Sequence, residues 1–348
     1  MSSSPVQPAH PAHASGAVAS TWLAPRDVVI IGGAGFIGSN LALRLLQDHP
    51  SCSLTLIDNM SAGGSMRIAD LAGDQRVHVH EVDIRTPRDL AGLLPAGALL
   101  IHLASNPNIA AATTNPAIDF DAGTAVTNAV VEAARVSGIA RIVYASGSGV
   151  YGDRGQALLR EDDACLAPVS TYAASKIAGE ALLSAYAEMF DIPAHVFRFG
   201  NVVGPRQTHG VGFDFALRLM ADPSALRVLG DGTQSKTYVH VNDVIDGILL
   251  ALATDSGELF TILNIGTDEY LTVADIASLA IELICPESAT RIEFGDSPRG
   301  WLGDVPVMRM SSQRIRARGW SPRVSSRDAV AEGICWVRDC LRPDGSPR

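Results

Sequence analysis

The sequence has few charged residues and no excess of basic ones. Of its 348 residues, 27 are Lys or Arg and 37 are Asp or Glu, which gives a formal net charge of −10 at pH 7. A nucleic-acid or anionic-membrane partner requires a broadly basic face, so this balance argues against both. No apolar run approaches the roughly 20 residues that a membrane-spanning helix needs, and no membrane span is predicted.

Cysteine is also scarce. The five cysteines are odd in number, scattered, and nowhere spaced as in a zinc site. We therefore predict no metal site and expect a reducing, cytoplasmic location. They are Cys52, Cys165, Cys285, Cys335 and Cys340.

Residues 1–25 lack both the basic and the apolar segment of a signal peptide. They are rich in Ser, Ala, Pro and His, and we expect a disordered tail. The rest is too long for one small core. We expect a nucleotide-binding domain over residues 26–200 and a smaller lobe over 201–341, some segments of which return to the first domain.

The strongest local signal is a glycine-rich turn in residues 28–38. The β-branched run Val28–Ile31 predicts a buried strand of a parallel sheet. Gly32 then allows a tight turn, Gly35 lets the backbone approach a pyrophosphate, and Gly38 lets the following helix pack closely. The N-terminus of that helix offers unpaired N–H groups to phosphates. The predicted cofactor contacts in this turn are Gly32, Gly35, Phe36, Ile37 and Gly38.

Asp58 distinguishes between two dinucleotides. It ends a second predicted strand, Leu54–Ile57, about twenty residues beyond the glycines, where dinucleotide sites place an acid. A carboxylate there accepts hydrogen bonds from the ribose hydroxyls and repels a 2′-phosphate. The next residue is Asn59 and not an arginine, so NAD is favoured over NADP.

Short β-rich runs alternate with amphipathic segments, which predicts a doubly wound (Rossmann) α/β fold with a parallel sheet and a smaller C-terminal α/β substrate-binding lobe. The expected strands are Val28–Ile31, Leu54–Ile57, Val77–Val82, Leu99–Leu103, Arg141–Ala145, Ala194–Phe199 and Leu263–Ile265. The expected helices are Gly35–Gln47, Pro87–Leu94, Pro116–Ser137, Thr171–Phe190, Val241–Leu252, Val273–Ile284 and Ala329–Leu341.

In such a fold the ligand lies at the carboxyl ends of the strands. Small or polar residues follow three of the expected strands, and we expect them to line the cofactor site. They are Asp83 and Ile84, then Leu103, Ala104 and Ser105, then Ser146, Gly147 and Ser148.

Tyr172 and Lys176 carry the predicted chemistry. They are four residues apart on an expected helix and so share one face. An ammonium group and a positively charged nicotinamide nearby favour the phenolate, which predicts a lowered pKa for Tyr172. Tyr172 can then act as general base toward a hydroxyl whose carbon gives up a hydride.

Together these motifs resemble the extended short-chain dehydrogenase/reductases, over about residues 27–340. The chain is similar to their NAD-dependent nucleotide-sugar epimerases and dehydratases, with UDP-hexose 4-epimerases as the nearest type. The motifs are Gly32–Gly38, Asp58-Asn59, Asp83-Ile84-Arg85, His102-Leu103-Ala104, Val150-Tyr151-Gly152, Tyr172–Lys176, Arg198–Gln207 and Tyr238–Asp243.

The resemblance implies a tightly held, recycled NAD⁺ and a nucleotide-sugar substrate, most simply a UDP-sugar. Tyr172 would deprotonate the sugar 4-hydroxyl while C4 delivers hydride, and the 4-keto sugar would turn before hydride returns to its other face. Lys176 would hold the nicotinamide ribose. Asp83 and Ile84 would contact the adenine, and Asn201 the diphosphate.

Two departures from the family pattern concern catalysis. Gly147 occupies the position of the family's catalytic Ser or Thr; Ser146 and Ser148 flank it, and we expect Ser148 or a water to take over that hydrogen bond. The 4,6-dehydratases carry an Asp-Glu pair where this chain has Ser148 and Gly149, so dehydration is disfavoured. The glutamate that marks UDP-glucuronate decarboxylases is also absent, because Ser148 and Gly149 occupy these positions.

A third departure concerns the diphosphate. Lys236 replaces one family arginine; Trp301 stands at the offset of a second, three residues before Asp304, with Arg299 nearby. We predict substrate contacts from Lys236, Arg299 and Asp304, although solvated Lys236 and Arg299 side chains are the alternative. Arg206 either reads a C6 carboxylate of a hexuronate or satisfies loop carbonyls.

The family resemblance leaves other functions open. They are a 4,6-dehydratase, a one-way 4-ketoreductase, and an NAD-binding protein without catalysis. Relatives commonly pair through the two long helices placed here at 116–137 and 171–190, whose alanine-rich faces permit close packing. We therefore expect a homodimer.

Overall fold

The computed structural model describes residues 27–61, 64–84, 90–163, 167–255 and 257–348. The predicted tail at residues 1–25 lies outside this range, as do residues 87–89 of the helix predicted at Pro87–Leu94. The other predicted elements can be compared with the structure directly.

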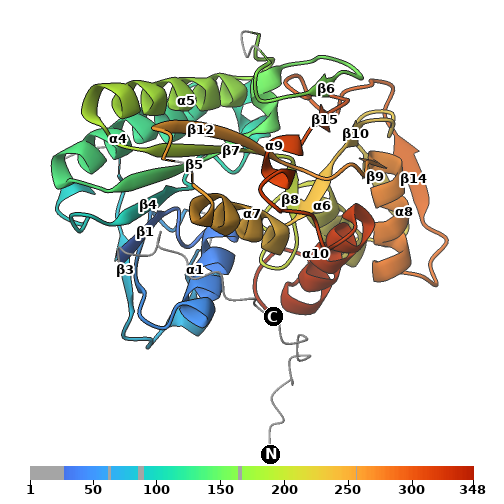
Figure 1. Cartoon of the computed structure of the whole chain (residues 1–348). Helices are drawn as coiled ribbons and strands as arrows, with labels where there is room; N and C mark the ends of the chain where they lie inside the picture. Colours follow the sequence, from blue (N-terminus) through green and yellow to red (C-terminus); the bar gives the residue numbers. More distant parts are fainter. Residues whose placement is uncertain (1–26, 62–63, 85–89, 164–166, 256) are drawn as a thin grey trace, which may run out of the picture.

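A seven-stranded, fully parallel sheet forms the centre of the molecule (Figure 1). Its register pairs Val28 with Leu54 on one side and with Leu99 on the other. The predicted Rossmann sheet is confirmed, with strand ends shifted by at most three residues. In spatial order the strands are β12 (Phe260–Ile265), β7 (Ala194–Phe199), β5 (Arg141–Gly147), β4 (Leu99–His102), β1 (Asp27–Ile31), β2 (Ser53–Asp58) and β3 (Val77–Glu81).

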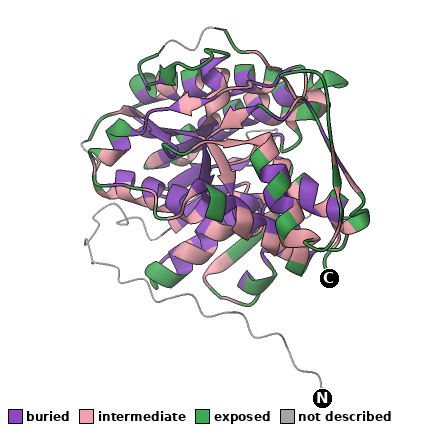
Figure 2. Ribbon diagram, turned by 90° about the vertical axis from the view of Figure 1, so that its right-hand side faces the viewer, coloured by how far each residue is buried: buried purple, intermediate pink, exposed green. Residues whose placement is uncertain are grey.

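Helices cover both faces of this sheet. In Figure 1, α4 (Val126–Ser137) and α5 (Thr171–Phe190) lie above it, and α1 (Phe36–Asp48) and α7 (Val241–Ala253) below it. The two apolar layers so formed are fully buried, which explains the near-continuous apolar strands in the sequence. Figure 2 shows this burial as purple strands between the helices.

The two long helices differ in how well the sequence predicts them. For α5 the prediction is confirmed at both ends, because Ser170 caps it by accepting a hydrogen bond from the Ala173 amide at 3.1 Å. The predicted helix Pro116–Ser137 is interrupted by a π-helical segment, η4 (Phe120–Ala125), before α4 begins. Gly123 in that segment lies against α5, where a Cβ would come 2.6 Å from the Ser175 hydroxyl oxygen.

A smaller lobe packs against the end of the sheet. Its core lies between α6 (Val211–Ala221), α8 (Val273–Ile284), α10 (Ser326–Cys340) and the strand pair β9 (Ala225–Val228) and β14 (Arg291–Phe294). Strand β12 and helix α7 come from this part of the sequence, but β12 belongs to the central sheet and α7 packs against it. The shorter elements are α2 (Gly64–Arg67), η2 (Ala69–Leu71), η3 (Ile109–Thr113), η5 (Ser148–Tyr151), β6 (Leu158–Leu159), β8 (Asn201–Val203), β10 (Ser235–Lys236), β11 (Tyr238–His240), β13 (Leu271–Thr272), β15 (Arg309–Met310) and α9 (Gln313–Arg316).

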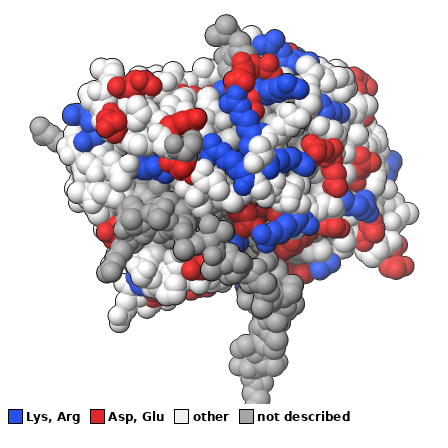
Figure 3. Space-filling model, in the orientation of Figure 1, with Lys and Arg blue, Asp and Glu red and all other residues white. Residues whose placement is uncertain are grey.

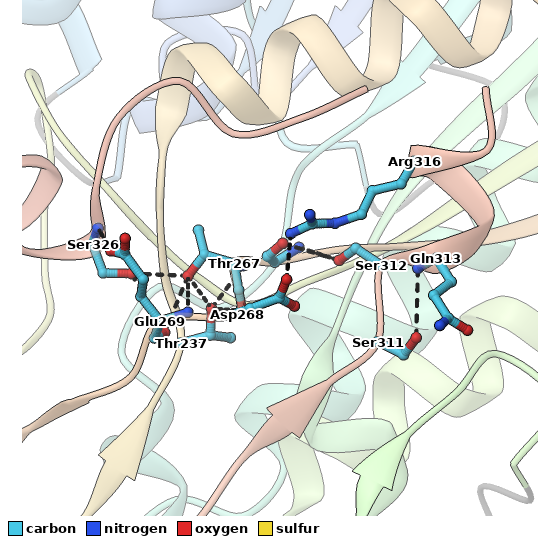
Figure 4. A network of polar contacts seen from close by, with 10 residues as sticks. Thr237, Thr267, Asp268, Glu269, Ser311, Ser312, Gln313, Arg316 and Ser326 are labelled. Carbon is cyan, nitrogen blue, oxygen red and sulfur yellow. Dashed lines mark hydrogen bonds and ion pairs between the residues drawn. The ribbon is translucent and has the colours of Figure 1, made fainter. Parts of the chain in front are cut away.

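A hydroxyl network joins the two parts (Figure 4). The Thr237 and Thr267 hydroxyls lie 2.9 Å apart, and the Thr267 hydroxyl lies 2.9 Å from that of Ser326 at the start of α10. The Ser326 amide donates to Glu269 at 2.6 Å. These buried bonds fix the strand segment that carries Lys236 and Tyr238 against the end of β12.

The surface has mixed charge. On the face shown in Figure 3, Lys and Arg side chains are interspersed with Asp and Glu. In the part of the chain that the structure describes, no helix is both long and apolar enough to cross a bilayer.

Candidate active site

One cavity of about 810 Å³ opens at the carboxyl ends of the sheet strands, between the sheet and the smaller lobe. It brings together most of the residues that the sequence singled out. Those that line it are Gly32, Gly35, Phe36, Ile37, Gly38, Asp58, Asn59, Ile84, Leu103, Ala104, Ser105, Ser146, Ser148, Tyr172, Lys176, Asn201, Lys236 and Asp304. Asp83, Arg206 and Arg299 do not line it.

The glycine turn has the geometry of a dinucleotide cradle. Gly32 has a φ of +80°, and a Cβ there would lie 2.8 Å from the Ala104 nitrogen. A Cβ on Gly38 would lie 2.3 Å from the Gly32 carbonyl oxygen, so helix α1 can approach the turn only without one. No side chain caps α1 at Gly35, which leaves its first N–H groups to the cavity. These residues fit a bound pyrophosphate.

Asp58 is held in place by the backbone around it. Its two carboxylate oxygens accept hydrogen bonds from the amides of Ala34 at 3.1 Å and Met60 at 2.9 Å. Each oxygen keeps a further lone pair for a ribose hydroxyl. The carboxylate lies at the end of β2 on the cavity wall, as predicted for an acid that reads the ribose.

Lys176 is buried behind the cavity. Its ammonium group donates to the Ala145 carbonyl at 2.8 Å and lies 5.5 Å from the centre of the Tyr172 ring. Burial lowers the pKa of Lys176 to about 8, and the negative charges of Glu180 and Asp119 oppose this shift. The lysine is therefore largely protonated at neutral pH.

The pKa of Tyr172 depends on its burial and on the groups around it. Burial raises it above its ordinary value, and only the Ser105 side chain, through a hydrogen bond, works in the other direction. Burial and the negative charge of Asp119 raise it in the protein chain alone. The predicted lowering includes the charge of a bound nicotinamide and stays a prediction for the cofactor-bound site.

A buried ion pair supports the catalytic helix from behind. Glu180 accepts hydrogen bonds from Arg198 at 2.7 and 3.0 Å and from the Ser146 hydroxyl at 2.5 Å. Because the Ser146 proton is committed to Glu180, this serine is poorly placed to donate to a substrate. Glu180 was not predicted, although its position four residues after Lys176 on one helix face was a readable signal.

Of the three basic residues predicted to contact the substrate, only one lines the cavity. Lys236 forms an ion pair with Asp304 on the cavity wall. Arg299 instead pairs with Asp153 at 2.9 Å, and Arg206 pairs with Asp70 and donates to the Arg67 carbonyl. Arg299 and Arg206 therefore lie outside the cavity. Each is held by an acidic residue that is distant in sequence.

Trp301, unlike Arg299 and Arg206, lines the cavity. A Cβ on Gly303 would lie 2.4 Å from the Trp301 ring and 2.8 Å from Cβ of Ser170, the residue that caps α5. The indole therefore lies near the start of the catalytic helix. Gln234, which the sequence analysis did not single out, also lines the cavity.

These features define a class of enzyme. A partly buried tyrosine and a buried lysine face the same cavity as a dinucleotide turn. This is the arrangement of an NAD-type site that moves a proton and a hydride together. A model of the NAD dependent epimerase/dehydratase family matches residues 28–266. The chain belongs to this family, and its cofactor is NAD, as the sequence predicted.

Relatives extend the similarity over nearly the whole chain. The UDP-glucose 4-epimerase of Mycolicibacterium smegmatis is 30% identical over 321 residues, which span 89% of this chain and 98% of that protein. A dTDP-glucose 4,6-dehydratase of an Actinoplanes species is 28% identical, over 89% of this chain and 97% of its own. The solved UDP-glucuronic acid 4-epimerase of Bacillus cereus, in complex with UDP-glucuronic acid and NAD, superposes with a TM-score of 0.80 at 25% identity and covers 90% and 99% of the two chains.

Proposed function

We propose that this protein is an NAD-dependent nucleotide-sugar 4-epimerase that acts on a UDP-hexose. The observation that carries the proposal is the Tyr172–Lys176 pair, which opens onto the same cavity as the glycine turn and Asp58. The nucleotide-sugar substrate comes from the family and from relatives that are named for UDP-sugars.

The chain's own residues move a proton at one oxygen. Tyr172 accepts the proton of the sugar 4-hydroxyl as the C4–H bond breaks, and it returns the proton to O4 after the 4-keto sugar has turned over. The glycine turn and Asp58 would hold NAD⁺, which would supply the acceptor for the C4 hydride and its source for return to the opposite face. Lys176 remains protonated behind the ring and stabilises the phenolate.

The other cavity residues hold the substrate. Lys236 and Asn201 supply donors for the diphosphate, and Asp304 keeps the Lys236 ammonium group oriented. Ile84 lies on the cavity wall where the adenine of the cofactor binds, whereas Asp83 is exposed beside it. Arg299 is paired with Asp153 and does not line the cavity, so it is not among these residues.

A hexose is favoured over a hexuronate. Arg206, the arginine considered for a C6 carboxylate, is paired with Asp70 and does not line the cavity. The 4,6-dehydratase alternative stays disfavoured because Ser148 and Gly149, which line the cavity, carry no carboxylate to remove a C5 proton.

Proton NMR of the purified protein with UDP-glucose tests the function. We expect UDP-galactose to form without added NAD, and little change in UDP-glucuronate. A 4-keto-6-deoxy product would identify a dehydratase. Stoichiometric consumption of added NADH would identify a ketoreductase, and no turnover at all would favour a binding protein.

Ser105 is proposed to supply the hydroxyl that Gly147 lacks. The Ser105 side chain interacts with the Tyr172 phenol, whereas Ser146 is committed to Glu180. We expect Ser105→Ala to lower kcat about tenfold or more and Ser148→Ala to have little effect. We propose Ser105 for this hydrogen bond in place of Ser148 or a water, which the sequence analysis expected.

Restoring the family hydroxyl provides the matched control. A Cβ on Gly147 would meet no atom within 4 Å, and its φ of −154° suits any residue. Gly147→Ser should therefore recover much of the kcat lost in Ser105→Ala. If Ser148→Ala is the slow variant, Ser148 is the functional hydroxyl.

We also propose a homodimer through η4, α4 and α5. Three large apolar side chains are exposed on these elements: Phe120 is 60% exposed, Val136 61% and Met189 71%. Exposed apolar side chains that lie together are typical of an interface. Sedimentation should show a dimer at micromolar concentration that Met189→Glu dissociates. A wild-type monomer would contradict this.

A cytoplasmic location remains an expectation. Cys52, Cys285, Cys335 and Cys340 are free thiols in the structure, which suits a reducing compartment.

A further inference from the structure

Asp119 is a buried acid beside the active site that the mechanism above does not use. The residue is 1% exposed and directly precedes η4. It does not line the cavity itself, although Ile118 and Ala122 on either side of it do. Because a buried carboxylate is costly unless it is hydrogen-bonded, the groups that Asp119 binds indicate what it does.

Its two carboxylate oxygens hold two different segments of the active site. One oxygen accepts a hydrogen bond from the Asn106 side-chain amide at 2.8 Å, in the loop that follows β4. The other accepts from the hydroxyl of Thr171, the first residue of α5, at 2.7 Å. Ser105 directly precedes Asn106, and Tyr172 directly follows Thr171. Asp119 therefore joins the segment that carries the Ser105 hydroxyl to the segment that carries the phenol.

The loop end of this bridge is well defined. The Asn106 side chain accepts a hydrogen bond from the Asn108 amide at 2.9 Å and donates to the Asn108 carbonyl at 3.0 Å. With the bond to Asp119, both N–H groups and the oxygen of the Asn106 amide are paired. Movement of this loop relative to α5 would therefore break the bond between Asn106 and Asp119.

The other end rests on the close packing of η4 against α5. A Cβ on Gly123 would come 2.6 Å from the Ser175 hydroxyl oxygen, so the two segments touch with no side chain between them. This contact places Asp119, at the start of η4, beside the start of the catalytic helix. The carboxylate thus has a fixed position from which it can hold the loop.

The charge of Asp119 has two opposing effects on the catalytic pair. Burial is the larger cause of the raised pKa of Tyr172, and the charge of Asp119 adds to it. Burial lowers the pKa of Lys176, and the charges of Glu180 and Asp119 oppose this. The hydrogen bond from Ser105, by contrast, lowers the pKa of Tyr172. Asp119 can therefore favour the phenolate through the segments that it holds.

We propose that Asp119 is a positioning residue that holds the Ser105 hydroxyl against the Tyr172 phenol. It does so by fixing the loop after β4 to the start of α5. This assignment rests on the proposed function, because it gives Asp119 its effect through the role proposed for Ser105.

Kinetics of Asp119→Ala with UDP-glucose test the assignment. The variant lacks both hydrogen bonds, and we expect kcat to fall about tenfold or more with little change in KM, as proposed for Ser105→Ala. The double variant with Ser105→Ala should be no slower than Ser105→Ala alone, because both changes remove the same contact. Asp119→Asn should recover most of the lost kcat, because its amide can accept from Asn106 and donate to the Thr171 oxygen.

Asp246→Ala is the matched control. Asp246 also joins two segments, since it pairs with Arg44 on α1 and with Arg323, and it does not line the cavity. Its kcat should equal that of wild type. Equal losses of kcat for Asp119→Ala and Asp246→Ala, or additive losses in the double variant, would show a general structural role and overturn the assignment. So would an Asp119→Asn variant that is as slow as Asp119→Ala.

Thr171→Val keeps the assignment testable if Asp119→Ala does not fold. It preserves the size of the side chain and removes only the second hydrogen bond. We expect a smaller loss of kcat that disappears in the Ser105→Ala background. An unchanged kcat in Thr171→Val would contradict the assignment.

Ionisation of Tyr172 tests the assignment without substrate. It is followed by the ultraviolet absorbance of phenolate in the NAD-loaded protein, with Tyr172→Phe as the reference. Ser105→Ala should move the titration midpoint to higher pH in wild type and in Asp119→Asn, but not in Asp119→Ala. Equal shifts in all three backgrounds would overturn the assignment, since Ser105 would then reach the phenol without Asp119. If the titrations behave as expected but wild-type protein does not convert UDP-glucose, the proposed function alone fails.

Discussion

Tyr172→Phe should lower kcat by about 10²- to 10⁴-fold while the protein keeps its fold and its NAD. The phenyl ring preserves the buried packing, but no group remains beside the sugar to take the proton of the 4-hydroxyl. Hydride cannot leave C4 without forming an unfavourable protonated ketone. Steady-state kinetics with UDP-glucose, together with the NAD content of the purified variant, measures the effect.

Tyr186→Phe is the matched control, because it makes the same change on the same helix. Tyr186 lies near the far end of α5 and donates to Glu132 at 3.1 Å, away from the cavity. Its kcat should equal that of wild type. If Tyr172→Phe retained full activity, a different base would have to be sought.

Glu180→Leu should cost about 3–5 kcal/mol of unfolding free energy. The change leaves the Arg198 guanidinium buried, with 4% of the residue exposed, and without its carboxylate. It also removes the acceptor of the Ser146 hydroxyl. Urea unfolding at neutral pH measures the loss.

Two further variants identify the cause of that loss. Glu180→Leu with Arg198→Met should recover most of the stability, since replacing a buried pair by apolar residues is often neutral. Glu282→Leu breaks an exposed pair with Arg327 and should cost less than about 1 kcal/mol. If Glu180→Leu and Glu282→Leu lowered the unfolding free energy equally, burial of the Glu180–Arg198 pair would not add to the cost of breaking it.

Local features of this fold could be predicted because they depend on short stretches of sequence. Helix α5 shows a cap residue followed by a long helix-forming run, and α8 has a capping box of Thr272 and Asp275. The glycine turn and Asp58 are likewise set by spacing. For the same reason, the NAD site can be predicted from the sequence.

Features that depend on distant partners could not be predicted. Arg299 and Arg206 are charged residues in the expected segments, yet their partners Asp153 and Asp70 are 146 and 136 residues away in sequence. The π-helical segment at Phe120–Ala125 contains Gly123, which lies against α5, and helical periodicity in the sequence does not reveal this contact. The position of Gln234 on the cavity wall also depends on the fold and could not be predicted from its neighbours in sequence.

The fate of the C4 hydrogen tests the central claim most directly. Wild-type protein is incubated with UDP-glucose labelled with deuterium at C4, in ordinary water and without added NAD. The account predicts UDP-galactose that retains the label at C4, because the hydride returns to the carbon it left. Loss of the label to solvent, or its appearance at C6, would contradict the account.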